Sequence, residues 1–368
     1  MKRTYLNLAL GGGGVKGISY VGMFGVAQQR GYAWENIAGV SAGALAGAYV
    51  AAGYGYEDLK LLMNNFSIEN LAINRLNNAH PLVSRYIQYY NGIYPYGRQW
   101  TWNFLAHRHI SATRGEDYGI EARDISSSNR NLIENIITFS NEGSICDGDY
   151  LEDWVYKALS SRGIKKFGDI KNGKADDLNP NGYKVRMTAV DLTRWRVITI
   201  PDDLDFYGVD PDSFEVAKAV RMSTCVPFIF KPVEIKKTTG DNTKTYRIVD
   251  GGVLDNFPIW LVDKNADTHT IGFKLNRSQN KLFSLNVPLN ILRALVSATH
   301  DTGIPHYAYN TDIVAGINTG KVSSFDFELG ESDRQYLLEC GNRSAEIFFD
   351  KFENKKLNTK KYRNYYSV

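Results

Sequence analysis

The sequence predicts an α/β fold with a mostly parallel central sheet flanked by helices. Two observations near the N-terminus favour it. Residues 5–10 form a short apolar run that leads through glycines into a helical pattern at 18–30, and residues 36–40 lead directly into a second helical pattern at 42–52. The third observation comes later in the chain, because the apolar residues 247–249 end in an aspartate and two glycines. Strands alternating with helices are typical of parallel sheets.

Composition narrows the class of protein. The 368 residues can bury a large core, and we expect one domain over residues 1–368. An apolar content of 43% and a charged content of 23% are typical of a soluble globular protein. The net charge of +3 is too small to indicate a nucleic-acid partner, although it is compatible with a weak preference for anionic surfaces.

The cysteines and the N-terminus indicate where such a chain would act. Cys146, Cys225 and Cys340 show no metal-ligand spacing, so the sequence predicts neither a disulfide framework nor a metal site. The first apolar run, residues 6–10, is too short for a signal peptide or a membrane span, and no other stretch approaches 18 apolar residues. We expect a cytoplasmic protein whose membrane contact is peripheral, with delivery by a leaderless route left open.

Residues 11–17, with the sequence GGGGVKG, follow the first strand and precede a helix. Backbone N–H groups in such a loop can hold an anion. A nucleotide phosphate would favour a closing Lys-Ser/Thr pair, but Gly17 stands there, and a dinucleotide would favour an acidic residue after the second strand, where Ser41 stands instead. The oxyanion of an acyl-transfer intermediate also fits, and so does a plain tight turn.

The pattern Gly39-x-Ser41-x-Gly43 between strand and helix is typical of a nucleophile elbow. The two glycines remove β-carbons that would clash in so tight a turn. Ser41 would then stand clear of the sheet, near the N-terminal N–H groups of the helix. A serine needs a base and an oxyanion site to react, and an ordinary glycine-rich helix start gives the same pattern.

Three features around this stretch have two interpretations each. Lys16 could contact the phosphate of a lipid head group or pack on the surface. Residues 56–149, rich in Tyr, Asn and Trp, form an insertion that could be a lid over the site or a structural element. His107 and His109 within it could act as a base or could be solvated surface residues.

The second half of the chain continues the α/β pattern. The expected helices and strands are a helix at 151–162, strands at 185–192 and 196–200, a helix at 214–222 capped by Asp212-Ser213, strands at 229–235 and 246–249 around a polar tip at 236–244, a strand at 270–275 and a helix at 290–300. We expect residues 276–368 to form a helical C-terminal region with a basic tail. That tail, residues 355–363, is either solvated or in transient contact with anionic lipid.

Asp250 follows an apolar strand and precedes Gly251 and Gly252, which let the chain turn sharply. The carboxyl ends of strands are where open α/β sheets place their chemistry. An Asp-Gly turn without function gives the same pattern.

Taken together, the glycine loop at 11–17, the Gly-Val-Ser-Ala-Gly at 39–43 and the Asp-Gly-Gly at 250–252 resemble, in order and spacing, the three signatures of patatin-like phospholipases. Residues 219–227 resemble the family's segment before its proline, and residues 256–258 resemble its asparagine–proline end. Lys16 departs from the arginine that is usual in the family, and the insertion matches no segment of the family that we can place.

The resemblance implies a Ser–Asp dyad, with Ser41 as nucleophile and Asp250 as base, on a patatin-like fold related to the α/β-hydrolase layout. It implies that N–H groups of Gly12, Gly13 and Gly14 hold the oxyanion. No metal and no cofactor are required. The expected partner is a phospholipid or other acyl lipid at a membrane surface, and the sequence does not show whether a protein activator is needed.

Three functions remain open on this basis. The first is a lipid acyl hydrolase of the phospholipase A or lysophospholipase type. The second is an acyltransferase on the same dyad, which needs an alcohol acceptor that outcompetes water. The third is a non-catalytic module that binds phosphate or lipid through its glycine loop.

Overall fold

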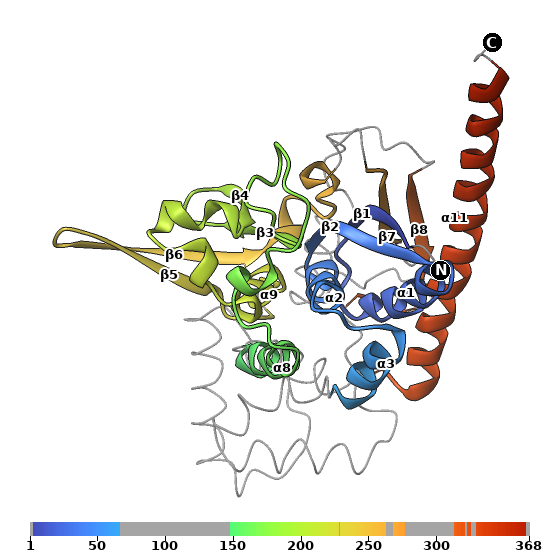
Figure 1. The fold of residues 1–368 in the computed structure, drawn as a ribbon. Coiled ribbons are helices and arrows are strands. Elements are labelled where there is room, and N and C mark those ends of the chain that lie inside the picture. The colour runs from blue at the N-terminus through green and yellow to red at the C-terminus, as the bar shows by residue number, and fades with distance from the viewer. Residues whose placement is uncertain are drawn as a thin grey trace, which may run out of the picture.

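The computed structural model describes residues 3–66, 148–227, 229–262, 268–276, 313–320, 322–324 and 329–365, with side chains described to residue 354. These residues form an eight-stranded sheet with helices packed against it (Figure 1). The α/β fold class is confirmed. The sheet is mixed, parallel on one side and antiparallel on the other.

Five strands make the parallel side of the sheet. β1 pairs with β2 and with β7, β2 pairs with β3, and β7 pairs with β8. β1, β2 and β3 are buried over most of their length, as expected for strands covered on both faces, whereas β8 at the edge is partly exposed. Their bounds are β1 Thr4–Leu10, β2 Tyr32–Val40, β3 Val185–Asp191, β7 Thr270–Asn276 and β8 Val314–Asn318.

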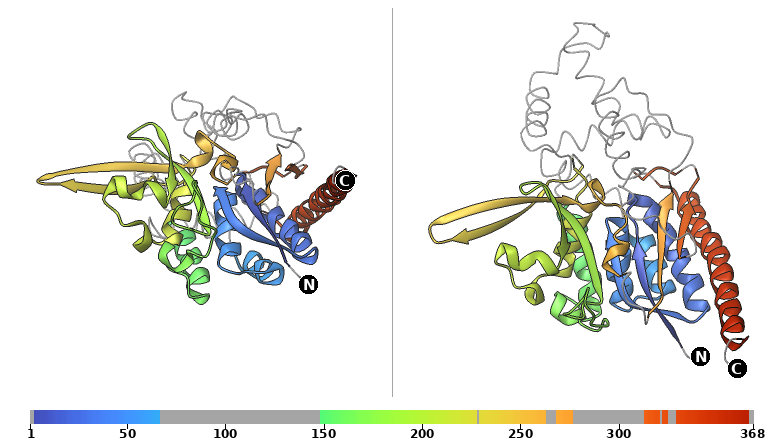
Figure 2. Two further views of the ribbon diagram at one scale, coloured as in Figure 1. Left: turned by 45° about the horizontal axis from the view of Figure 1, so that its top comes forward. Right: turned by 90° about the horizontal axis from the view of Figure 1, so that it is seen from above.

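Three strands make the antiparallel side: β4 (Arg196–Ile200), β5 (Val233–Thr239) and β6 (Asn242–Asp250). β5 and β6 form a two-stranded ribbon that projects from the body of the fold (Figures 1 and 2). The expected polar tip at 236–244 is therefore wrong, because the pairing continues to Thr239↔Asn242. Residues 236–244, with the sequence KKTTGDNTK, contain no apolar residue, so the sequence shows no strand pattern there.

β3 pairs with three strands: β4 on one edge, and β2 and β6 on the other. β4 pairs with it from Met187 to Asp191, which occupies one edge. The other edge therefore holds both β2, up to Val40↔Thr188, and β6, from Ala189↔Asp250 onward. β2 and β6 run in opposite directions, so their carboxyl ends meet head to head along β3.

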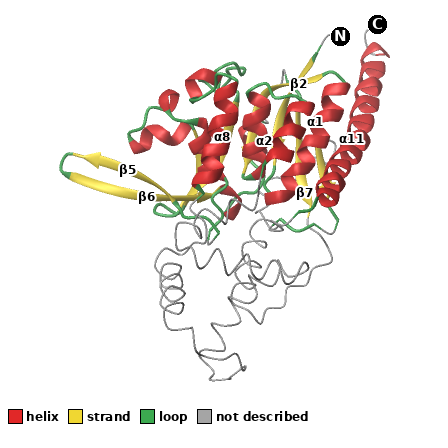
Figure 3. Ribbon diagram, turned by 90° about the horizontal axis from the view of Figure 1, so that it is seen from below, coloured by secondary structure: helices red, strands yellow, loops and turns green. Residues whose placement is uncertain are grey.

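Helices cover one face of this sheet, as seen from below in Figure 3. The expected helix at 214–222 begins two residues later, because Phe214 and Glu215 are extended and the Val216 N–H donates to the Lys165 carbonyl. The expected helix at 290–300 lies outside the described residues. The helix bounds are α1 Ser19–Gln29, α2 Ala42–Ala51, α3 Tyr56–Asn65, α8 Asp149–Ser161, α9 Val216–Ser223 and α11 Glu331–Tyr365.

α11 contains residues 355–363 and crosses α1 at very close range. A β-carbon on Gly341 would collide with the Ser19 carbonyl, and one on Gly22 would lie 2.9 Å from the Asn342 amide nitrogen. Further along, Arg30 at the end of α1 pairs with Glu346 and Asp350 of α11. The last helix is thus fastened to the first. None of the helices in the described part of the chain is both long and apolar enough to cross a bilayer.

Candidate active site

Ser41 occupies the turn between β2 and α2. Its backbone adopts φ 53° and ψ −121°, a conformation that a non-glycine residue takes only where the surrounding structure enforces it. The side chain is 2% exposed. The residue therefore has the strained geometry of a nucleophile elbow, with α2 beginning directly after it.

Two glycines allow this turn because other backbone lies against them. A β-carbon on Gly39 would lie 2.5 Å from the carbonyl oxygen of Gly43, and one on Gly43 would lie 2.8 Å from that of Gly11. Neither distance leaves room for a side chain. The elbow and the glycine loop are thus packed backbone to backbone.

The glycine loop is held from several sides. The Gly11 N–H donates to the Phe273 carbonyl (3.0 Å), and the buried Tyr20 hydroxyl donates to the Gly11 carbonyl (2.7 Å). A β-carbon on Gly12 would lie 3.2 Å from the Ser41 β-carbon, so the loop borders the serine directly.

The three glycines proposed as oxyanion donors differ. The Gly12 N–H donates to the carbonyl of Asn256 at 3.2 Å. For the N–H groups of Gly13 and Gly14, the described residues offer no hydrogen-bond acceptor. Gly13 is buried, so an unused N–H there would be costly without a ligand. The loop thus leaves two donors able to meet a negative charge.

Asp250 ends β6 at the point where β6 meets β2. It is fully buried, opposite Ala189 of β3, while Val40 lies opposite the preceding residue, Thr188. One residue along a strand is about 3.3 Å. Ser41, the next residue after Val40, therefore begins its turn beside Asp250.

Local hydrogen bonds orient this aspartate. One carboxylate oxygen of Asp250 accepts the N–H of Gly252 at 2.7 Å, and the Asp250 N–H donates to the Cys225 carbonyl at 2.8 Å. Burial raises the pKa of the adjacent Cys225 thiol, and the charge of Asp250 raises it further, against an opposing effect of Arg221. The thiol beside the aspartate is therefore neutral at pH 7.

Ser223, at the end of α9, was missed by sequence reasoning. The Ser41 N–H donates to the Ser223 hydroxyl at 3.0 Å, and that hydroxyl donates to the Thr188 carbonyl at 2.7 Å. The hydroxyl thus connects the Ser41 turn to β3. The only signal in the sequence was a serine three residues before the Val226-Pro227 pair, which also fits an ordinary helix end.

Lys16 lies below the surface rather than on it. The side chain is 4% exposed, and its Nζ donates to the carbonyl of Asn276 at the end of β7 at 3.1 Å. Contact with a lipid head group would require this side chain to move. His107, His109 and residues 67–147 of the expected insertion lie outside the described residues. Of the insertion's described ends, residues 56–65 form α3, and α8 begins at residue 149.

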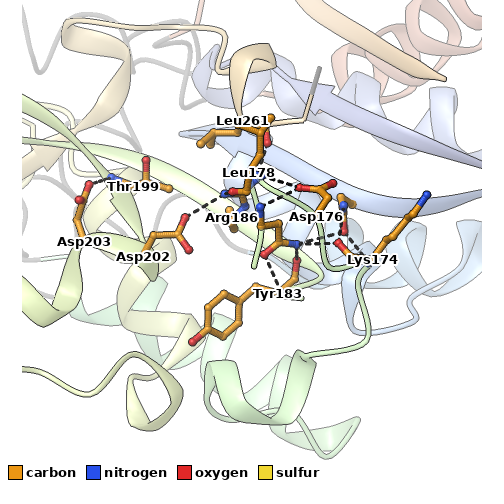
Figure 4. A network of polar contacts seen from close by, with 11 residues as sticks. Lys174, Asp176, Leu178, Tyr183, Arg186, Thr199, Asp202, Asp203 and Leu261 are labelled. Atoms are coloured by element: carbon orange, nitrogen blue, oxygen red, sulfur yellow. Dashed lines mark hydrogen bonds and ion pairs between the residues drawn. The ribbon is translucent and has the colours of Figure 1, made fainter. Parts of the chain in front are cut away.

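A buried arginine fastens the segment that follows Asp250. Arg186 of β3 donates to the carbonyls of Leu178 and Leu261 and pairs with Asp202 at 3.1 Å (Figure 4). Leu261 belongs to the same connection as the Asp-Gly-Gly turn. Burial raises the pKa of Asp202, although the charge of Arg186 opposes the shift.

Sequence comparisons connect the chain with one protein family and with two known proteins. A family model described as patatin-like phospholipase matches residues 8–263. YqhO of Bacillus subtilis (strain 168), which carries the description uncharacterized protein, is 29% identical over 349 residues, covering 94% of this chain and 98% of that protein. R571 of Acanthamoeba polyphaga mimivirus is 30% identical over 151 residues, covering 38% of this chain and 48% of that protein.

Two solved structures are similar at low identity. VipD from Legionella pneumophila is 20% identical with a TM-score of 0.48, over 95% of this chain and 67% of that chain. ExoU of Pseudomonas aeruginosa, in its complex with SpcU, is 14% identical with a TM-score of 0.43, over 95% of this chain and 53% of that chain.

Proposed function

Because the chain belongs to the patatin-like phospholipase family, we propose that it is a lipid acyl hydrolase of the phospholipase A or lysophospholipase type, with Ser41 as nucleophile and Asp250 as base. The observation that carries this assignment is the meeting of β2 and β6 along one edge of β3, which sets the serine turn beside the buried carboxylate.

The proposed reaction has two halves. Asp250 accepts the hydroxyl proton of Ser41 while Oγ attacks the acyl carbonyl carbon. The glycerol alcohol then leaves with the proton returned by Asp250, and the acyl group remains on Ser41. Water adds to this ester, giving its proton to Asp250, and the fatty acid leaves as Oγ regains a proton.

The negative oxygen formed in each half needs donors that are already in place. We assign this role to the N–H groups of Gly13 and Gly14, and to Gly12 only if its bond to Asn256 opens. Each such donor is typically worth about 10²–10³ in rate. The strained backbone of Ser41 contributes in a different way, because it fixes the direction of Oγ before substrate arrives.

The test measures fatty-acid release from mixed phospholipid vesicles and from a soluble short-chain ester. We expect Ser41→Ala and Asp250→Asn to lose at least about 10³-fold in both assays. Ser213→Ala and Asp153→Asn, which change an exposed hydroxyl and an exposed carboxylate, serve as matched controls and should match the wild type.

Equal release by Ser41→Ala and the wild type would remove Ser41 from the mechanism. A serine-reactive fluorophosphonate probe gives an independent readout, and we expect it to label the wild type and not Ser41→Ala. Adding a lysolipid acceptor separates hydrolysis from acyl transfer, because a transferase would form a diacyl product instead of free fatty acid.

A further inference from the structure

The strongest unexplained feature outside the site is Trp195, in the turn between β3 and β4. The residue is 86% exposed and has φ 56°. A left-handed backbone costs a non-glycine residue about 1–2 kcal/mol, and an exposed indole leaves a large apolar surface in water. Among the described residues the Trp195 indole makes no ring contact and no hydrogen bond, so most of its surface is open to a partner outside the fold.

Cations and an aromatic ring lie next to this turn. The Arg194 guanidinium carbon lies 3.5 Å from the centre of the Phe206 ring, and Lys237 Nζ lies 4.4 Å from the same centre. Phe206 itself is 40% exposed. Two positive groups therefore lie against one half-exposed ring, and the Arg194 guanidinium also lies 3.9 Å from the Asp191 carboxylate.

The ribbon adds a further like-charge pair. Lys237 of β5 and Lys244 of β6 lie directly opposite each other, which destabilises a sheet. In the part of the chain that the structure describes, no ion pair includes Lys237, Lys244 or Arg196. We define the cation–aromatic patch as Arg194, Trp195, Arg196, Phe206, Lys237 and Lys244.

This patch lies at the same edge of the sheet as the proposed site. β2 and β3 run parallel, so Ser41 and the turn after Asp191 both follow carboxyl ends. The turn is also tied to the strand that carries Asp250, because the Leu192 N–H donates to the Arg247 carbonyl at 2.9 Å and the Arg247 N–H donates to the Thr193 hydroxyl at 3.0 Å. A surface in contact with the patch would therefore face the edge that holds the nucleophile.

We propose that the cation–aromatic patch docks the protein on the surface of an anionic phospholipid bilayer. This inference rests on the proposed function, in which the substrate is a membrane lipid. An indole prefers the boundary between water and acyl chains, and each lysine or arginine near an anionic membrane contributes about 1 kcal/mol of attraction. Lipid phosphates would neutralise the unpaired cations, and insertion of the indole would bury its surface.

The experiment measures binding to sedimenting vesicles in the Ser41→Ala background, so that no lipid is consumed. The vesicles contain phosphatidylcholine alone or with about one-third phosphatidylserine. The test variants are Trp195→Gly, in which glycine accepts the positive φ without strain, and the double variant Lys237→Ala/Lys244→Ala. The double variant Lys157→Ala/Lys351→Ala removes the same charge from exposed positions on α8 and α11 and is the matched control.

We expect Lys237→Ala/Lys244→Ala to bind the anionic vesicles about 10- to 30-fold more weakly than the control, from about 1 kcal/mol per cation. Trp195→Gly should bind more weakly while unfolding at the same temperature or higher. Added salt should weaken binding of the Ser41→Ala parent more than binding of the Lys237→Ala/Lys244→Ala variant. The proposal is overturned if both patch variants bind as tightly as the control variant. It is also overturned if the Ser41→Ala parent binds neither vesicle, and that result would favour an acidic protein as the partner of the patch.

A second assay separates this result from the proposed function. With Ser41 restored, the patch variants should hydrolyse a soluble short-chain ester at the wild-type rate while losing activity on anionic vesicles. If the wild type itself hydrolyses neither substrate, the proposed function fails, and the vesicle-binding comparison still decides the role of the patch.

Discussion

The two sides of the sheet hold their parts of the site in different ways. On the parallel side, backbone touches backbone: the carbonyl of Gly11 lies where a side chain of Gly43 would be. On the antiparallel side the ribbon reaches into solvent, and a β-carbon on Gly240 at its tip would meet no atom within 4 Å. The turn at Ser41 is therefore held by close packing, whereas the ribbon that leads to Asp250 is held by strand pairing. The two sides should respond differently to the same substitution.

Among the substitutions that compare the two sides, the largest effect should come from Gly12→Ala, where the parallel side touches Ser41. The new β-carbon would collide with the Asn256 side chain and press on Ser41. We expect fatty-acid release to fall by about 10²-fold, because the new methyl group displaces the Ser41 side chain from its attacking position. The melting temperature should change little, because the end of the Asn256 side chain can rotate away. Gly330→Ala, with open space around it, is the control, and activity within threefold of that control would contradict the close contact we describe.

The second comparison places one substitution on each side of the sheet. Gly43→Ala should lower the free energy of unfolding by about 2–3 kcal/mol, because rigid backbone fills the space. Gly240→Ala should cost about 1 kcal/mol, from its φ of 58° alone. Urea denaturation measures both values. Equal losses would show that close packing does not distinguish the two sides.

The smallest effect concerns the Ser223 hydroxyl, which joins the Ser41 turn to β3. Ser223→Ala leaves the Ser41 N–H and the Thr188 carbonyl without this partner, and we expect about a tenfold lower kcat with little change in KM. Thr224→Val is the control, since that hydroxyl bonds only to carbonyls of its own helix. Both variants should lose similar stability. A similar fall in kcat for both would mean that Ser223 has only a structural role.

Local sequence patterns were sufficient to predict the elements around Ser41 on the parallel side of the sheet. The glycines around Ser41 and in residues 11–17 act on the nearest backbone, so their spacing predicted the strand, turn and helix that the structure contains. β3 and β4 were also predicted nearly to the residue, because apolar runs on both sides of a short polar turn are a strong hairpin signal.

Pairing between distant segments was not readable in the same way. The sequence indicated that Asp250 ends a strand but not that the strand runs against β2 along a shared edge, since register depends on contacts across the sheet. The outer part of the β5–β6 ribbon was not predicted, because its residues do not pack on a core and so show no apolar pattern. Trp195 and Ser223 carry no local pattern, and only the folded chain shows what surrounds them.

The crossing of α1 and α11 has a consequence for how the chain is made. Ser19 and Gly22 meet residues 338–342, so about 320 residues separate the two partners. At roughly 5–20 residues per second, a ribosome needs about 16–64 s to deliver the second partner after the first. During that interval the α1 surface beneath α11 stays open to other proteins in the cell, so newly made chains should engage chaperones until α11 has been synthesised.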